Sequence, residues 1–533
     1  MDPFANLTGG PGTLAGLFGE DARPAKRLMA KMNKATVVRL LSLVFALTLF
    51  AGCGGSNAPP TPASLNAANL NLIFVVSEDL AYQAPGDVNS TTANLTNQGL
   101  QRSLSMATFL QQQVLGTNNV TGIYALEPMT HLQTASNYPD MVALETIQQF
   151  AMLNQITLSS DPQGGTPYTG QSYPINASYA SGPLPSGVAV PPQFCPNCQG
   201  LDFRDQNGDN EALVTGIVKA NVPGFYVFSA PWETTRALLA NINKLQRYNL
   251  SLPASYISPN FIYAISITPS GRAHLVTYNS NLNPPSTYPV LPPPPLVSTT
   301  CNTPQTQAFF SITVTGGQNG AVIPAGINTN ETLYIIRHAD AHPRTYWDDN
   351  NYVGAGQWRA LDLPNALLGK VVSPNQVYSN DPAQFGQGSV LYSSDGSVSP
   401  SGDHYWSSVA PPLTAAPYAI ANNLPYNLVT SFDLSDSNVA QETNTFFFFI
   451  NGGKFSNQTV LLAWSFQFIQ PTILELLTSY NAAQQAPPSD VWPPTDYDTI
   501  WTVKLDAHGN LTVNNGMCEG ISSAALPPTP PQF

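Results

Sequence analysis

The stretch Leu333-Tyr334-Ile335-Ile336-Arg337-His338-Ala339-Asp340 decides the fold class predicted for this chain. Its first part is a short apolar run of the kind that forms a buried strand. Arg337 and His338 follow at once, so two chemically active side chains stand where a strand gives way to a loop. Open α/β sheets bind ligands at such strand ends. The stretch therefore predicts an α/β domain with a functional edge at Arg337 and His338.

The same order of segments occurs twice along the chain, which predicts an internal duplication. Each half contains an apolar run, a Gly-x-x-Arg segment that opens a helical stretch, and three further strand-like runs. These segments are 73–76, 99–102, 123–125, 227–232 and 262–265 in the first half, and 333–336, 356–359, 377–379, 460–464 and 500–503 in the second. Alternating strand and helix patterns predict a three-layer α/β/α domain in each half.

Composition predicts where these domains begin and end. A proline-rich linker at 286–300 separates a domain at 70–285 from a domain at 301–526. Residues 1–53 have the pattern of a signal peptide, and residues 54–69 that of a flexible tether. Residues 527–533 remain as a tail.

The second half resembles the histidine phosphatase superfamily, which includes phosphoglycerate mutases, histidine acid phosphatases and bacterial phosphohistidine phosphatases. The resemblance rests on Arg337-His338-Ala339 after a strand, on Gly356-Gln-Trp-Arg359-Ala-Leu, and on Val377-Tyr-Ser-Asn-Asp-Pro382. It covers 301–526 well and 70–285 in outline, and it implies two tandem three-layer domains of this type.

The resemblance also implies a reaction for the edge that carries Arg337 and His338. His338 would attack phosphorus and carry the phosphoryl group, while Arg337, a second Arg and a second His would bind the phosphate oxygens. Neutral imidazole is a good nucleophile, and guanidinium offers paired donors to phosphate. No metal or other cofactor is needed for this chemistry.

Part of the family's phosphate pocket is missing from the second half. Ala410 falls where relatives carry a phosphate-binding Arg, and Ser465 and Phe466 fall where relatives carry Glu and the second His. His342 and Arg344 are candidates to replace these missing phosphate-binding groups. The alternative is that both are solvated loop residues.

The first half has no counterpart of the nucleophile. Ser77 and Glu78 are expected at the place of Arg337 and His338, and Thr234 at the place of the second His. A carboxylate at that place would repel phosphate. We therefore expect a packing or binding role for this half.

The N-terminal segment predicts export and a lipid anchor. Basic residues precede the apolar run Leu40–Phe50 and the sequence Ala51-Gly52-Cys53. The run is too short to span a bilayer but suits a signal peptide, of normal length if Met32 is the natural start. Cys53 would carry the lipid of a bacterial lipoprotein, which places the protein at a membrane on the periplasmic or cell-surface side. An ordinary signal peptide with an incidental Cys is the alternative.

The remaining cysteines would lie in a compartment that permits disulfides. Cys301 and Cys518 stand near the two ends of the second half and are candidates to pair. Cys195 and Cys198 form a single CxxC motif, which favours a local disulfide. A zinc site is weakly supported, because no second CxxC motif accompanies them.

The net charge of the chain excludes nucleic acid as the partner. The incomplete phosphate pocket is compatible with two functions. The formal charge is −13, whereas phosphate backbones are bound by clustered Lys and Arg. The favoured function is that of a lipid-anchored binding or structural pseudoenzyme. The alternative is a weak extracytoplasmic phosphomonoesterase that acts on a phosphorylated small molecule through a phosphohistidine at His338. Losing one preorganised donor typically costs on the order of 10²–10³ in rate, which favours the pseudoenzyme.

Overall fold

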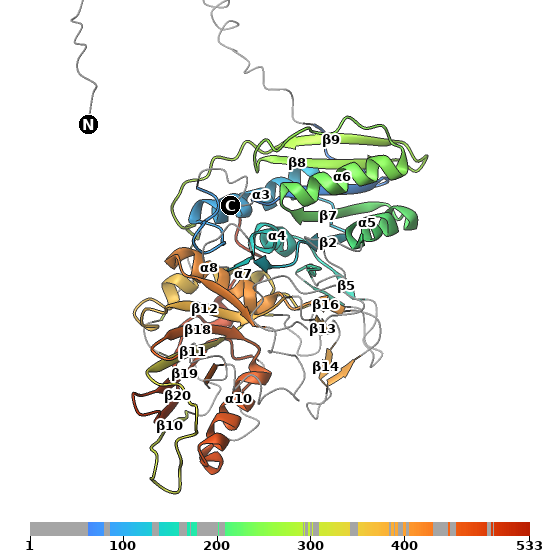
Figure 1. Cartoon of the computed structure of the whole chain (residues 1–533). Helices are drawn as coiled ribbons and strands as arrows, with labels where there is room; N and C mark the ends of the chain where they lie inside the picture. Colours follow the sequence, from blue (N-terminus) through green and yellow to red (C-terminus); the bar gives the residue numbers. More distant parts are fainter. Residues whose placement is uncertain are drawn as a thin grey trace, which may run out of the picture. The chain divides into compact units, whose positions relative to one another are not determined.

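A computed structural model describes residues 62–78, 86–130, 138–158, 168–170, 172–177, 201, 208–291, 293, 297–298, 301, 309–341, 350–382, 385–387, 390–392, 398–400, 405–429, 446–447, 455–487, 492–493 and 495–533. Two mixed β-sheets with helices on their faces make the chain an α/β protein (Figure 1). Both sheets belong to one compact unit, Thr61–Phe533.

The first sheet is built around a central strand with helices on both of its faces. Its strands have the order β2-β7-β1-β8-β9, with bounds β2 Gly122–Ala125, β7 Gly224–Ala230, β1 Leu70–Val76, β8 Phe261–Ile267 and β9 Ala273–Asn279. β2, β7 and β1 are parallel, whereas β8 and β9 are antiparallel additions. The helices are α3 Asn97–Phe109, α4 Val142–Met152, α5 Asp209–Ala220 and α6 Trp232–Gln246.

The second sheet has the same kind of construction. Its strands have the order β10-β20-β19-β11-β18-β12-β17, with bounds β10 Ser311–Val314, β20 Leu511–Cys518, β19 Thr499–Leu505, β11 Glu331–Arg337, β18 Thr459–Trp464, β12 Gln376–Asn380 and β17 Tyr426–Val429. β11, β18, β12 and β17 are parallel, and β19, β20 and β10 are antiparallel. The helices are α7 Gly354–Ala366, α8 Ala410–Asn422 and α10 Phe466–Ser479.

Short elements complete the described chain. A π-helical turn at Leu110–Val114 extends α3, and 3-10 turns lie at Ala483–Gln485 and Ser523–Ala525. The two-stranded pairs are β3 Met129–Thr130 with β4 Pro139–Asp140, β5 Thr157–Leu158 with β6 Tyr168–Thr169, β13 Phe385–Gln387 with β16 Tyr405–Ser407, and β14 Val390–Tyr392 with β15 Val398–Pro400. Among the described residues, no helix is both long and apolar enough to span a membrane.

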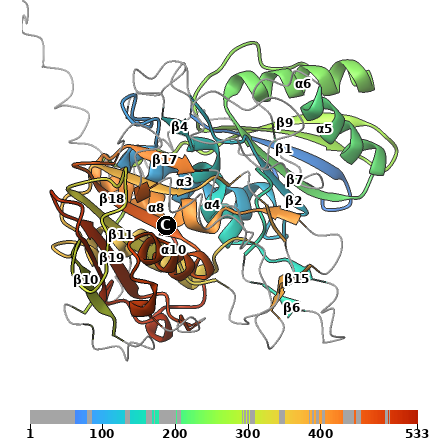
Figure 2. The ribbon, with the colours of Figure 1, turned by 60° about the horizontal axis from the view of Figure 1, so that its bottom comes forward.

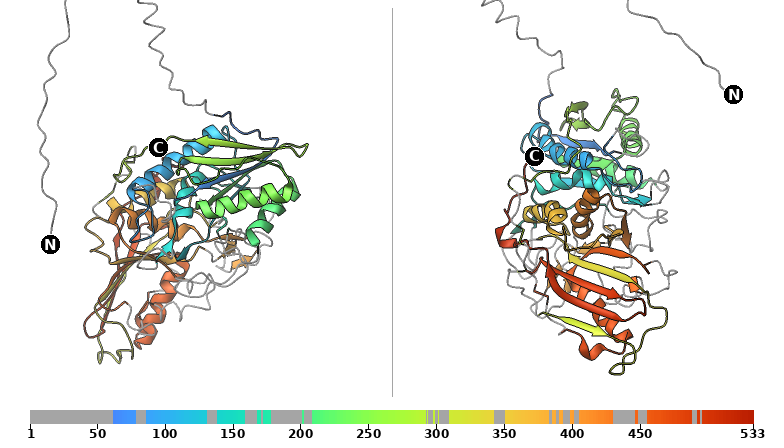
Figure 3. Two further views of the ribbon diagram at one scale, coloured as in Figure 1. Left: turned by 45° about the horizontal axis from the view of Figure 1, so that its top comes forward. Right: turned by 90° about the vertical axis from the view of Figure 1, so that its left-hand side faces the viewer.

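The helices α3, α4, α7 and α8 form a double layer between the two sheets (Figures 1 and 2). Their apolar side chains share one core with both sheets, since Ile73 and Val75 of β1 belong to the same cluster as Tyr334 and Ile336 of β11. The outer faces are covered by α5 and α6 on the first sheet and by α10 on the second (Figure 3). The two halves therefore bury apolar surface against each other.

Buried hydrogen bonds also join the halves. Gln148 Nε2 of α4 donates to Asn351 Oδ1 at 2.9 Å. The backbone N–H of Ala177 donates to Ser407 Oγ at 2.8 Å. Because buried polar groups need partners, these bonds favour one arrangement of the halves over others.

The two sheets share one topology. The order β2-β7-β1-β8-β9 in the first corresponds to β12-β18-β11-β19-β20 in the second, with the same strand directions. The turn into the last strand is also alike: Gly271 has φ +79° and Gly509 has φ +77°, a left-handed conformation that glycine adopts easily. β10 and β17 extend the second sheet at its two edges.

The register of the central strands differs by one residue from the predicted alignment of 73–76 with 333–336. Ile73 and Val75 of the first half face the shared core, and so do Tyr334 and Ile336 of the second. A slip of one residue would send these side chains to the opposite face. Both faces of these strands are buried and apolar, so sequence alone does not reveal the slip.

Cys301 and Cys518 form a disulfide, as predicted, with a Cα–Cα distance of 5.6 Å. The bond ties the segment before β10 to the last residue of β20. Cys53, Cys195 and Cys198 lie outside the described residues.

The double change Cys301→Ser with Cys518→Ser should destabilise the protein. The bridge closes a loop with a sequence separation of 217, for which the chain-entropy model gives about 5 kcal/mol as an upper value. Urea unfolding should show a loss of about 2–5 kcal/mol in the variant. A reducing agent should weaken the parent protein by the same amount and leave the variant unchanged; equal stability of the two oxidised proteins would contradict the account.

Buried Glu145 should make stability fall with rising pH. Burial raises the pKa of its carboxyl to about 8, although the N–H of Leu95 donates to it at 3.1 Å. Between pH of about 4.5 and 8 the unfolded chain releases this proton while the folded chain keeps it, so stability declines across that window, by on the order of 3–5 kcal/mol at most.

The change Glu145→Gln should flatten this decline and leave a variant that is more stable than the parent protein above pH 8. The measurement is urea unfolding at several pH values, with exposed Glu233→Gln as the matched control. Parallel pH profiles for the parent protein and Glu145→Gln would refute the assignment.

Candidate functional site

Arg337 and His338 lie at the end of the central strand of the second sheet. Arg337 is the last residue of β11. The backbone N–H of His338 donates to Trp464 O, the last residue of the parallel strand β18, at 2.9 Å. The ends of β11 and β18 therefore meet at one edge, where ligands bind in open α/β sheets.

The imidazole of His338 is held in one tautomer. Its Nδ1 lies 2.9 Å from the carbonyl oxygen of Ala339. Because a carbonyl only accepts, Nδ1 carries the proton and Nε2 keeps a free electron pair. Burial, with a contribution from Arg337, lowers the pKa of His338 to about 3. The ring is therefore neutral near pH 7 and chemically suited to act as a nucleophile.

The guanidinium of Arg337 is enclosed by aromatic rings. Its Cζ lies 3.8 Å from the ring centroid of Tyr497 and 4.2 Å from that of Phe466. Nη1 donates to the backbone carbonyl of Asp496 at 3.0 Å. Cation–π attraction and this hydrogen bond hold the guanidinium in place.

Helix α8 is joined to the loop that follows His338. The backbone N–H of Ala339 donates to Thr414 Oγ1 at 2.8 Å, and that hydroxyl donates to the carbonyl of Ala410 at 2.7 Å. Ala410 is buried at the start of α8, where its methyl group offers no donor to an anion. The elements that carry Ala410 and Phe466 thus both reach the edge at His338.

The remaining predicted positions divide into two groups. Ser465 is the residue before α10 and Phe466 is its first residue. His342 and Arg344, predicted as phosphate ligands, lie outside the described residues.

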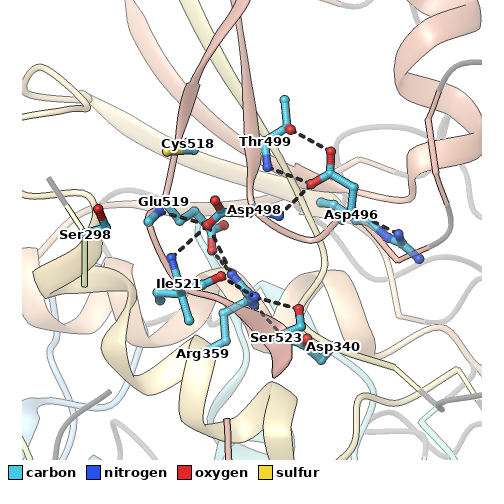
Figure 4. Close-up of polar contacts among 12 residues, drawn as sticks. Ser298, Asp340, Arg359, Asp496, Asp498, Thr499, Cys518, Glu519, Ile521 and Ser523 are labelled. Atoms are coloured by element: carbon cyan, nitrogen blue, oxygen red, sulfur yellow. Dashed lines mark hydrogen bonds and ion pairs between the residues drawn. The ribbon is translucent and has the colours of Figure 1, made fainter. Parts of the chain in front are cut away.

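Arg359 is the second arginine of this region, and carboxylates surround it (Figure 4). Nε lies 2.5 Å from Asp340 Oδ2, and Nη1 lies 2.6 Å from Glu519 Oε2. Nη2 donates to Ile521 O and Ser523 Oγ, both at 2.9 Å. Burial alone lowers the pKa of Arg359, but the two carboxylates raise it above its ordinary value. The charge of Arg359 is therefore already compensated.

The first half contains a similar arrangement around Arg102, with one carboxyl group instead of two. Arg102 Nε lies 2.7 Å from Asp87 Oδ2, and Nη1 donates to Asn260 Oδ1 at 2.6 Å and to Leu282 O at 2.8 Å. In both halves a glycine three residues before the arginine packs so closely on the aspartate's carbonyl that a Cβ would collide with it.

Sequence reasoning aligned the two Gly-x-x-Arg segments but missed their aspartate partners. Asp87 and Asp340 lie in loops whose spacing to the arginine differs between the halves. The available signal was an arginine within an otherwise apolar helix face, which needs a buried anion.

The corresponding edge of the first half differs from its predicted form. Ser77 donates its backbone N–H to Ala230 O at 3.0 Å, as His338 does to Trp464, so Ser77 and not Glu78 stands at the histidine's place. Glu78 is one residue further, where its Oε1 accepts from Tyr256 Oη at 2.6 Å.

The predicted place of Thr234 is also corrected. α6 begins at Trp232, as α10 begins at Phe466, so Trp232 holds the place of Phe466. Thr234 lies two residues into α6. The pattern Trp-Glu-Thr misled the alignment, because this tryptophan starts a helix whereas Trp464 ends a strand.

The described residues thus combine a neutral nucleophile with little spare positive charge. Arg337 is enclosed and Arg359 is compensated. The part of the chain that the structure describes contains no group of three or more His, Cys, Asp or Glu side chains that could hold a metal ion. The edge can supply a nucleophilic imidazole, but it offers an anion few free donors.

No protein-family model matches the chain, and no curated protein matches it. Solved structures that are similar to part of it include three SixA proteins. A SixA phosphohistidine phosphatase of Agrobacterium tumefaciens shows 13% identity and a TM-score of 0.22 over 33% of this chain and 93% of its own. The protein histidine phosphatase SixA complexed with tungstate shows 18% identity and a TM-score of 0.22 over 35% of this chain and 97% of its own. SixA of Nakamurella multipartitia shows 16% identity and a TM-score of 0.20 over 34% of this chain and 86% of its own.

The change Arg359→Met should destabilise the protein strongly, because it leaves Asp340 and Glu519 buried without their cation. The expected loss is about 3–5 kcal/mol in chemical unfolding. Arg102→Met should cost less, since it deprives a single carboxylate of its partner. Exposed Arg236→Met is the control and should stay within about 0.5 kcal/mol of the parent protein. A cost for Arg359→Met no larger than that of the control would show that the network does not support the fold.

Proposed function

We propose that the chain is an exported, lipid-anchored binding or structural protein, built on a duplicated histidine-phosphatase scaffold and catalytically impaired in both halves. The shared strand order and the matching Arg–Asp pairs, Arg102–Asp87 and Arg359–Asp340, support the duplication. The domains at 70–285 and 301–526 are the proposed repeats, each of them three-layered, and 286–300 is the proposed linker between them.

The observation that carries the impaired assignment is the enclosure of Arg337. In the proposed pocket this guanidinium should meet phosphate, yet its faces lie on Phe466 and Tyr497. Phe466 takes the place of the second histidine, so a ring without a proton donor stands where a donor is required. Phosphoryl transfer depends on cationic and hydrogen-bonding groups around the transferring phosphate.

Charge balance supports the same assignment. Asp340 and Glu519 bind Arg359, which leaves that arginine no unpaired charge for a ligand. Ala410 adds only a methyl group. A phosphate dianion would therefore lose its hydration at this edge and gain few donors in return.

One observation favours the alternative, a weak phosphomonoesterase acting on a phosphorylated small molecule. The bond from Nδ1 of His338 to Ala339 leaves Nε2 with its electron pair, and the lowered pKa keeps the ring neutral. His338 Nε2 would then attack phosphorus and displace the alcohol, which takes a proton from water, with Arg337 as the neighbouring cation. Water would next attack the phosphohistidine, which releases inorganic phosphate and restores the neutral imidazole.

The protein should hydrolyse generic phosphomonoesters at or near background. The double change Ala410→Arg with Phe466→His should raise turnover by about 10² or more, because each change restores a donor at the edge. The measurement is the release of inorganic phosphate, with the same double change in a His338→Ala background as the control.

Two results would overturn this assignment. Robust hydrolysis by the parent protein that is lost in His338→Ala would establish the phosphatase. A folded double variant without any gain would mean that Ala410 and Phe466 do not line the phosphate position.

The lipid anchor has its own test. Cys53→Ser should abolish lipid incorporation and release the protein from the membrane fraction, since Cys53 is the proposed acceptor after Ala51-Gly52. The measurement is labelled fatty-acid incorporation together with membrane fractionation. A protein that is released from membranes with Cys53 intact would contradict the anchor.

A further inference from the structure

The segment Pro527–Phe533, here called the strap, lies across both halves of the molecule. Trp358 of α7 donates its indole Nε1–H to Thr529 O at 2.7 Å. Gln149 of α4 donates its Nε2–H to Pro531 O at 2.7 Å. Figure 3 shows the end of the chain running from the second half to a position beside the first-half helices. The strap thus binds one helix of each half through its backbone.

The composition of the strap suits this mode of binding. Its first five residues are Pro-Pro-Thr-Pro-Pro, and proline has a fixed φ and no N–H. Such a segment tends toward a polyproline II helix, which loses little entropy on binding and leaves its carbonyls free to accept. Indole and amide N–H groups are the complementary donors, and aromatic surfaces flank proline segments in known recognition modes.

The contact is close and partly buried. Pro530 and Pro531 are buried, and Phe533 packs on the apolar cluster that contains Trp358. A Cβ on Gly354, the first residue of α7, would come within 2.6 Å of Pro530 N. The backbone of Gly354 is not left-handed, so it is the approach of the strap that requires glycine here.

We propose that the surface formed by Gln149, Gly354 and Trp358 is a polyproline-binding site, and that the strap is its intramolecular ligand. Docked there, the strap holds the two halves in one arrangement. A free proline segment competes poorly, because a tethered ligand has an effective concentration on the order of millimolar. Loosening the strap should therefore open the site to a peptide of the same sequence.

The test uses the full chain and the synthetic peptide Pro-Pro-Thr-Pro-Pro-Gln-Phe. The double change Pro530→Ser with Pro531→Ser weakens the strap and leaves the surface intact. This strap variant should bind the peptide at least tenfold more tightly than the parent protein, in calorimetry or fluorescence titration. Adding Trp358→Phe, which keeps an aromatic ring but removes the N–H, should weaken that binding about fivefold to tenfold.

A folded strap variant that binds the peptide no better than the parent protein would overturn the proposal. So would equal binding after Trp358→Phe. Folding is checked by circular dichroism and by a cooperative urea transition.

A second measurement applies if the strap variant does not fold. The side chain of Thr529 is exposed although its carbonyl is bound, so a fluorophore on Thr529→Cys reports the docked strap. Excess peptide should lower the fluorophore's anisotropy, and so should Gly354→Ala. Gly216→Ala in α5 is the control, since its Cβ meets open space. An anisotropy that neither the peptide nor Gly354→Ala changes would contradict the site.

Discussion

A buried arginine in each half holds the loop after the central strand against the antiparallel end of its own sheet. Arg359 binds Asp340 on one side and Glu519 on the other, and Arg102 binds Asp87 in the corresponding place. An arginine without these partners could not remain buried, and its removal would leave the carboxyl groups buried without a cation. The ion pair to Asp340 ties the loop after His338 to α7, and the ion pair to Asp87 ties the corresponding loop to α3.

The same ion pairs limit the chemistry available at the edge that carries His338. The ion pairs hold Arg359 in a structural role. Among the described residues, Arg337 is then the cation that adjoins His338. Arg337 is in turn fixed by Phe466 and Tyr497. The edge therefore keeps a nucleophile in its reactive tautomer while its cations are occupied by the protein itself. A scaffold of this kind can be retained for its stability and its surfaces, and the surface beneath the strap is one of them.

Sequence predicted the α/β class, the strands β1, β2, β7 and β8 with their counterparts in the second sheet, and the Cys301–Cys518 bond, because apolar runs and cysteine positions carry those signals directly. It did not predict the one-residue offset in the alignment of β1 with its counterpart β11, since both faces of these strands are apolar. The partners of Arg359 were also missed, because ion pairs between distant segments leave no periodicity. Sequence predicts a tail at 527–533, whereas the structure shows a docked segment, because composition alone does not distinguish a free proline segment from a docked one.

The central claim is that His338 does not carry a phosphoryl group. The direct measurement is to incubate the protein with a radiolabelled phosphomonoester, quench under alkaline conditions that preserve phosphohistidine, and quantify label on the peptide that contains His338. His338→Ala supplies the background. We predict label no higher than that background. Label approaching one phosphate per chain, absent from His338→Ala, would contradict the account and establish a working phosphatase.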